Sequence, residues 1–172
     1  MNINWKQKRS NLALGILILL NVLLYTYLFA FDTFTISGGS MEPTLYHEDH
    51  IIAHKTDNVD RGQIILIQDP GLADIANGTP EEPPKLIKRV IGIPGDKITL
   101  QQNRLYVNDE LLIEDLPGEM AQDGEEVVQL ADNEYFVLGD NYATSLDSRT
   151  FGPIKRETII GRAIFRLPKW IP

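Results

Sequence analysis

The chain has 172 residues, enough for one domain, and 43% of them are hydrophobic, so it is not a disordered polar segment. It contains no cysteine, which excludes disulfides, a thiolate nucleophile and cysteine-based metal sites. The formal net charge of -8 does not provide the basic surface that nucleic-acid binding needs, so we expect no nucleic-acid partner.

The beginning of the chain has the pattern of a membrane anchor. Residues 1–10 carry only Lys6, Lys8 and Arg9 as charges, and residues 11–31 carry none. Those 21 residues, at about 1.5 Å each in a helix, span roughly 32 Å and match a bilayer core of about 30 Å. A secretory signal peptide is the main alternative, but its apolar region is shorter and ends in a small-x-small cleavage site. We therefore predict a basic tail at 1–10 and an uncleaved transmembrane helix at 11–31.

The charge distribution predicts how this anchor is oriented. The first ten residues carry +3, whereas the rest of the chain has 13 basic and 24 acidic residues and carries -11. Basic flanks favour the inner side of a membrane. The sequence therefore indicates a single-pass protein in the lipid bilayer, with a cytoplasmic N-terminus and a body outside the cytoplasm.

Residues 32–172 are predicted to form a mainly β domain, an antiparallel barrel or sandwich. Short segments rich in Ile, Val, Leu or aromatic residues are bounded by Gly, Pro, Asp or Asn, as strands are. These segments are Thr33–Ile36, His50–Lys55, Gln63–Gln68, Lys85–Gly92, Lys97–Leu100, Arg104–Val107, Val127–Leu130, Glu134–Leu138 and Ile159–Arg166. We interpret 95–133 as a hairpin-rich insertion, and no window beyond the anchor has a helical period.

The segment Ser-Gly-Gly-Ser-Met-Glu-Pro-Thr-Leu at 37–45 contains a candidate nucleophile. Its two glycines permit positive φ and a close approach of backbone N–H groups. Ser40 follows them, so its hydroxyl could attack a carbonyl group while Gly38 and the Ser40 N–H form an oxyanion region. Taken alone, these residues are better interpreted as a plain turn between anchor and domain.

Two kinds of base could activate this serine. His47, His50 and His54 could complete a triad or bind a metal, but their spacing matches no zinc pattern, so we expect no metal site. Lys88 lies in the most aliphatic segment outside the anchor, where burial disfavours the ammonium and lowers the pKa. A neutral amine is a competent general base, although Lys88 could instead reach solvent or pair with an acid.

A third polar segment, at 139–152, follows an apolar strand. Short polar side chains in such a loop hydrogen-bond the backbone and can form a rigid polar floor. Asp147 and Arg149 could form an ion pair there, and Ser145 or Ser148 could orient an amine.

Together these segments resemble the bacterial type I signal peptidases, which are membrane-anchored Ser/Lys endopeptidases. The resemblance rests on Ser-Met-Glu-Pro-Thr-Leu at 40–45, Ile-Lys-Arg-Val-Ile-Gly-Ile-Pro-Gly-Asp at 87–96 and Gly-Asp-Asn…Ser-x-Asp-Ser-Arg at 139–149. It implies that Ser40 is the nucleophile, that Lys88 is the general base and that Ser145 helps to hold the lysine amine. The chain departs from some relatives at Gly38, where they carry a serine that supplements the oxyanion hole.

The resemblance also implies a substrate and a location. The substrates would be secreted preproteins with small residues before the cut, cleaved at a bacterial plasma membrane without metal or organic cofactor. An apolar pocket bordered by Ile36, Met41 and Leu86 would exclude large side chains. Two other interpretations stay open: a different Ser/Lys protease, such as those of repressor autoproteolysis, and a catalytically silent, membrane-tethered assembly factor.

Overall fold

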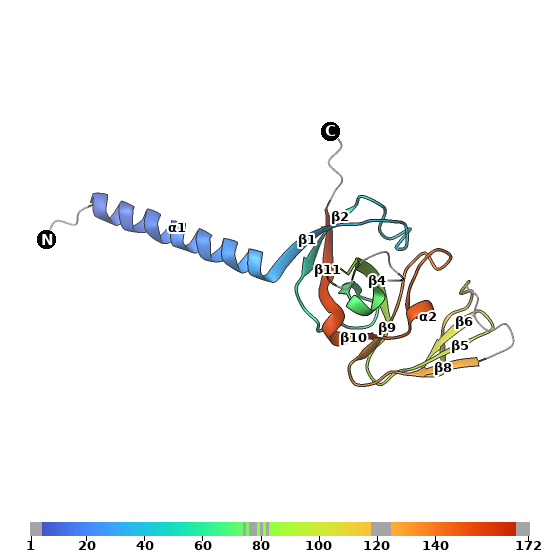
Figure 1. Ribbon diagram of the computed structural model, residues 1–172. Coiled ribbons are helices and arrows are strands. Elements are labelled where there is room, and N and C mark those ends of the chain that lie inside the picture. Colours follow the sequence, from blue (N-terminus) through green and yellow to red (C-terminus); the bar gives the residue numbers. More distant parts are fainter. Residues whose placement is uncertain are drawn as a thin grey trace.

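A long apolar helix precedes the rest of the fold. The computed structural model describes residues 5–73, 75, 79, 81, 83–117 and 125–167. Helix α1 (Trp5–Ala30) extends away from the β-sheets in Figure 1, and its segment Gln7–Ala30 is long and apolar enough to cross a membrane. This segment is exposed along its length, and a helix that is apolar on all sides is typical of a membrane span. The division into 1–10, 11–31 and 32–172 stays a prediction.

Two antiparallel sheets follow the helix. The larger sheet has seven strands in the order β1-β2-β11-β3-β4-β9-β10, and the smaller has four in the order β7-β6-β5-β8. The larger sheet contains β1 (Phe31–Thr35), β2 (His50–His54), β3 (Ile64–Gln68), β4 (Lys85–Gly92), β9 (Glu134–Leu138), β10 (Ile154–Lys155) and β11 (Ile159–Leu167). The smaller sheet contains β5 (Lys97–Gln101), β6 (Arg104–Val107), β7 (Glu110–Ile113) and β8 (Glu125–Gln129). The prediction of a mainly antiparallel β fold behind one apolar helix is confirmed.

Every strand expected from the sequence is present, but the sequence pattern does not indicate β7, β10 or the short helix α2 (Ser148–Phe151). Strand β7 forms because Asn108 and Asp109 both adopt positive φ, a two-residue turn that folds the chain back against β6. Helix α2 forms because the Asp147 side chain accepts a hydrogen bond from the Arg149 N–H and caps its first turn. Single 3₁₀ turns lie at Pro70–Leu72 and Arg156–Thr158.

Strand β4 occupies an interior position of the larger sheet, between β3 and β9. Its aliphatic residues Ile87, Val90 and Ile91 are buried, and Lys88 is paired in register with Ile65 of β3. Lys88 itself is only 3% exposed. The alternative in which this lysine reaches solvent is therefore excluded.

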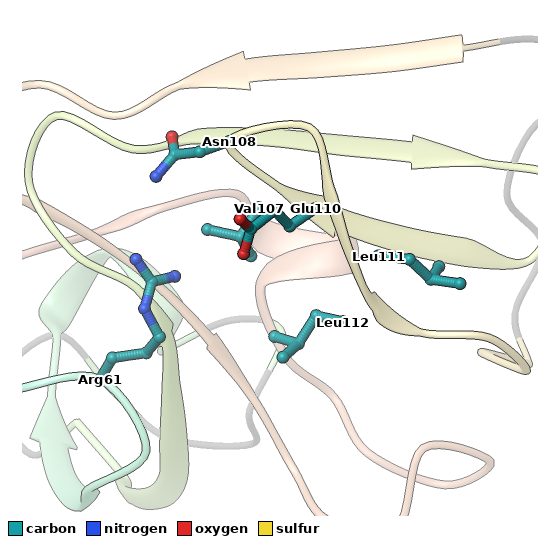
Figure 2. A pocket seen from close by; sticks show the side chains of 6 residues that line it. All are labelled: Arg61, Val107, Asn108, Glu110, Leu111 and Leu112. Atoms are coloured by element: carbon teal, nitrogen blue, oxygen red, sulfur yellow. The ribbon is translucent and has the colours of Figure 1, made fainter.

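The smaller sheet joins the larger one through an apolar cluster and a buried carboxylate. The Asp96 carboxylate accepts hydrogen bonds from the side chains of Arg61 and Asn108, each at 2.8 Å, and from the Ile93 N–H. Arg61 also borders a cavity of about 280 Å³, which Figure 2 shows between that side chain and the β6–β7 hairpin residues, including Leu112. The segment 95–133, expected to be rich in hairpins, contains all four strands of this sheet, while 118–124 lie outside the described residues.

Candidate active site

Ser40 and Lys88 meet in the structure although 48 positions separate them in the chain. Ser40 lies in the turn that follows β1, and Lys88 projects from β4. The Lys88 Nζ donates to the Ser40 Oγ at 3.0 Å and to the Ile87 carbonyl oxygen at 2.9 Å. The predicted nucleophile and base are therefore within hydrogen-bonding distance of each other.

The environment of Lys88 favours the neutral amine. Burial lowers the pKa of Lys88 from 10.5 to about 8, and the negative charge of Asp147 opposes part of this shift. None of the ion pairs in the described part of the chain includes Lys88. About half of the Lys88 side chains are therefore neutral near pH 8 and can accept a proton.

The turn that carries Ser40 is fixed by its own backbone and by a histidine. Gly38 has a φ of 84°, a conformation that favours glycine, and its N–H donates to the His47 Nδ1 at 3.2 Å. The Glu42 N–H donates to the Gly39 carbonyl oxygen at 3.1 Å, which closes the turn. The Ser40 N–H has no acceptor among the described residues and is available to a ligand.

Asp147 and Arg149 form the predicted ion pair. The Asp147 carboxylate is fully buried and accepts from the Arg149 Nε at 2.8 Å and from the Gly139 N–H at 3.1 Å. Arg149 also donates to the carbonyl oxygens of Tyr142 and Pro117. These bonds join the two ends of the loop that begins at Gly139.

Ser145 lies beside the serine turn. A Cβ atom built on Gly139 would lie 2.2 Å from the Ser145 Oγ and 2.4 Å from the Ser40 carbonyl oxygen, so these groups are neighbours. The Ser145 Oγ is buried and has no hydrogen-bond partner among the described residues. Its expected role in holding the Lys88 amine stays a prediction.

The sequence pattern indicates no function for Asn141 or for the Arg89–Asp140 pair. The Asn141 N–H donates to the Ser40 carbonyl oxygen at 3.0 Å, and its side chain donates to the Gly39 carbonyl oxygen at 3.2 Å. Arg89 binds both oxygens of the Asp140 carboxylate, at 2.7 and 2.6 Å. The position of these residues within the 87–96 and 139–149 motifs was the available signal, but spacing alone could not name their partners.

A small apolar cleft of about 140 Å³ opens beside Ser40 and Lys88. Two of the three predicted wall residues, Ile36 and Leu86, line this cleft. Met41 does not: it is 1% exposed and packs into the core, because the turn directs the side chain after Ser40 inward. The other residues that line the cleft are Phe34, Thr35, Ser37, Leu66, Lys85 and Ile87.

The three histidines do not come together. His47 contacts the Gly38 N–H, the His50 ring lies 3.0 Å from the Thr35 hydroxyl, and His54 packs against the ring of Phe31. Among the described residues there is no group of three or more side chains suited to hold a metal ion.

A serine hydroxyl bonded to a buried amine is the arrangement of nucleophile and base used in covalent catalysis. The family described as signal peptidase, peptidase S26, matches residues 9–170. The chain therefore belongs to the signal peptidase family, whose members are serine endopeptidases.

Two sequence relatives are named as signal peptidases. The chain is 34% identical over 135 residues to the probable signal peptidase I-2 of Synechocystis, covering 76% of this chain and 60% of that protein's length. It is 32% identical over 171 residues to signal peptidase I U of Bacillus subtilis, covering 91% of this chain and 86% of the relative. A crystal structure of a signal peptidase I from Enterococcus faecalis is 25% identical, with a TM-score of 0.45, covering 62% of this chain and 97% of that one.

Proposed function

We propose that this protein is a membrane-bound serine endopeptidase that removes N-terminal signal peptides from exported preproteins. The observation that carries the proposal is the 3.0 Å contact between the Ser40 hydroxyl and the amine of Lys88, which is buried and forms no ion pair with the described residues. Membership of the signal peptidase family supports the substrate class. In this proposal Ser40 is the nucleophile and Lys88 is the general base.

The first half of the reaction forms an acyl-enzyme. The neutral Lys88 amine takes the proton of the Ser40 hydroxyl as its Oγ attacks the scissile carbonyl carbon. The Ser40 N–H donates to the oxygen that becomes negative in the tetrahedral intermediate. When the intermediate collapses, the peptide C–N bond breaks, and protonated Lys88 gives its proton to the leaving amine.

The second half regenerates the enzyme. Lys88, again neutral, takes a proton from a water molecule that attacks the ester formed with Ser40. The same N–H group stabilises the second tetrahedral intermediate. Collapse breaks the ester bond, Lys88 returns the proton to the serine oxygen, and the severed signal peptide leaves with a new carboxylate.

The cleft beside Ser40 fits small side chains on the substrate. Its volume is about 140 Å³, and its wall includes the aliphatic side chains of Ile36 and Leu86, so it accommodates an alanine-sized group. We propose that this cleft receives residues preceding the cut.

The location follows from α1 and from the charges that surround it. We propose that α1 crosses a bacterial plasma membrane once, with its basic N-terminal end in the cytoplasm and the β-sheets outside. Exported preproteins present their cleavage sites on that side of the membrane. The enzyme and its substrates would then share the bilayer.

The test uses purified full-length protein in detergent and a preprotein substrate. We expect Ser40→Ala to abolish cleavage without a change in folding, because no other hydroxyl occupies its position. A triple substitution of His47, His50 and His54 removes the contact of His47 with the Gly38 N–H and should lower activity in part, but cleavage should persist because Lys88 remains the base. Cleavage by Ser40→Ala near the wild-type rate would refute the assignment, and an inactive wild-type protein would favour a silent assembly factor.

A further inference from the structure

Asn141 holds the backbone on both sides of Ser40. Its side-chain Nδ2 donates to the Gly39 carbonyl oxygen at 3.2 Å, and its own N–H donates to the Ser40 carbonyl oxygen at 3.0 Å. Asn141 follows β9, more than 100 positions further along the chain, so these bonds tie two distant segments together. No hydrogen bond connects Asn141 to Lys88 or to the Ser40 hydroxyl among the described residues.

The first of these bonds acts directly on the oxyanion donor. The Gly39 carbonyl and the Ser40 N–H belong to one peptide unit, which is planar and trans, so they point in opposite directions. The Gly39 carbonyl oxygen accepts from the Asn141 amide and also from the Glu42 N–H at 3.1 Å, so these two bonds together fix the direction of the Ser40 N–H. The second bond of Asn141 holds the peptide unit that follows Ser40. Together the two bonds of Asn141 fix the Ser40 backbone, and therefore the point from which its side chain extends toward Lys88.

Gly38 cannot supplement this donor. Gly38 has no side chain that could supply a second hydrogen bond, and its own N–H is already bonded to His47. The Ser40 N–H is free of protein acceptors in the described part of the chain. A small rotation of the Gly39–Ser40 peptide plane would turn the donor away from the developing negative charge.

We propose that Asn141 is a positioning residue that aims the Ser40 N–H at the oxyanion. Its side-chain amide acts through the Gly39–Ser40 peptide and does not touch the substrate. The inference rests on the proposed function, since it concerns the transition state of that reaction. A purely structural role would instead contribute stability without any selective effect on the tetrahedral intermediate.

The experiment compares Asn141→Ala with a matched control. Gln129 also donates its amide to backbone carbonyls, those of Gly95 and Asp96, but lies on β8 away from the serine turn. We expect Asn141→Ala to lower kcat by about ten- to one-hundred-fold with KM changed less than about two-fold. Gln129→Ala should leave kcat per folded molecule unchanged. The pH at half-maximal activity should stay the same in both, because neither change alters the surroundings of Lys88.

A second measurement isolates the oxyanion. A peptide aldehyde forms a tetrahedral adduct with a serine hydroxyl, whereas the corresponding peptide alcohol binds without forming one. Asn141→Ala should weaken inhibition by the aldehyde by the same factor as kcat and leave binding of the alcohol unchanged. Asn141→Leu, which has a similar shape but no amide donor and no charge, gives the same comparison if the alanine variant does not fold.

The inference is overturned if folded Asn141→Ala retains the wild-type kcat, or if aldehyde and alcohol lose affinity equally. Ser40→Ala, assayed in parallel, tests the proposed function separately. If that variant still cleaves the substrate, the Ser40 assignment fails whatever Asn141 does. If it is inactive while Asn141→Ala behaves as wild type, only the positioning role fails.

Discussion

Two of the buried networks among the described residues are built alike, each an aspartate paired with an arginine and bonded to a backbone N–H. Asp147 binds Arg149 and the Gly139 N–H beside the serine turn, and Asp96 binds Arg61 and the Ile93 N–H between the two sheets. Both carboxylates are nearly inaccessible to solvent. Burial of a charge is expensive unless it is paired, and both networks provide that pairing.

The two networks differ in what lies beside them. The Asp96 network also includes Asn108. The side chains of Asn108 and Arg61 both donate hydrogen bonds to the Asp96 carboxylate. Beside the Asp147 network lies the Lys88 amine, whose bonds go to a serine hydroxyl and a backbone carbonyl rather than to a carboxylate. A buried polar network alone therefore does not mark a site, whereas a buried base without an acidic partner does.

The largest effect is expected when the basic side chain at each network is replaced by the other basic type, Lys88 by arginine and Arg61 by lysine. Lys88→Arg keeps the charge but cannot lose a proton, so cleavage should fall by about 10²- to 10⁴-fold. Arg61→Lys in the other network should lose only part of its contacts and about 1 kcal/mol of unfolding free energy, with kcat unchanged. The measurements are preprotein cleavage and urea unfolding. An active Lys88→Arg enzyme would end the Ser/Lys interpretation.

A second comparison adds one methyl group in each region. In Gly139→Ala the new Cβ atom would lie 2.4 Å from the Ser40 carbonyl oxygen, so the serine turn must move, and kcat should fall by roughly 100-fold. In Gly92→Ala the Cβ atom would lie 2.7 Å from the side chains of Ile98 and Leu130, which destabilises the junction by about 1–3 kcal/mol. The cleavage activity per folded molecule should stay unchanged in Gly92→Ala. Equal loss of kcat in both would contradict the comparison.

A third comparison uses pH. Wild-type activity should rise through pH 8, because Lys88 is a base only when neutral and its pKa is lowered to about 8. Asp147 raises that pKa, so Asp147→Asn should shift the half-maximal activity to lower pH. Asp96→Asn should leave the profile in place while it weakens the junction. The measurement is the cleavage rate of each folded variant as a function of pH. A shift of the Asp147→Asn profile toward higher pH would refute the electrostatic role of Asp147.

The smallest expected effect is on stability. Free lysine holds its proton up to a pKa of 10.5, whereas folded Lys88 releases it at about 8, so the unfolded state binds more protons between these values. Unfolding free energy should therefore rise with pH in that window. Lys88→Met removes this dependence and should stabilise the protein near pH 7 by about 1–3 kcal/mol. Lys155→Met, at an exposed position, is the control and should change little.

Local pattern was sufficient to predict most of the strands and the apolar helix. Alternating or continuous apolar runs bounded by turn residues identified β4 and β9 with their bounds, because such runs must be buried wherever they pair. The pattern missed β7 because that strand exposes Leu111 and Leu112 and so has no buried period. It missed β10, which has two residues and exists only by pairing with β9.

At the candidate site, the kinds of group and their order in the chain could be predicted from the residues alone: a serine after two glycines, a lysine among aliphatic residues and a polar loop after an apolar strand. Which of these groups contact one another depends on the three-dimensional fold. The pairing of β4 between β3 and β9 buries Lys88 and lowers its pKa, and the return of β9 brings Asn141 against the serine turn. It also directed Met41 into the core instead of the cleft. Contact between distant segments depends on sheet order and backbone direction, which no local run of residues specifies.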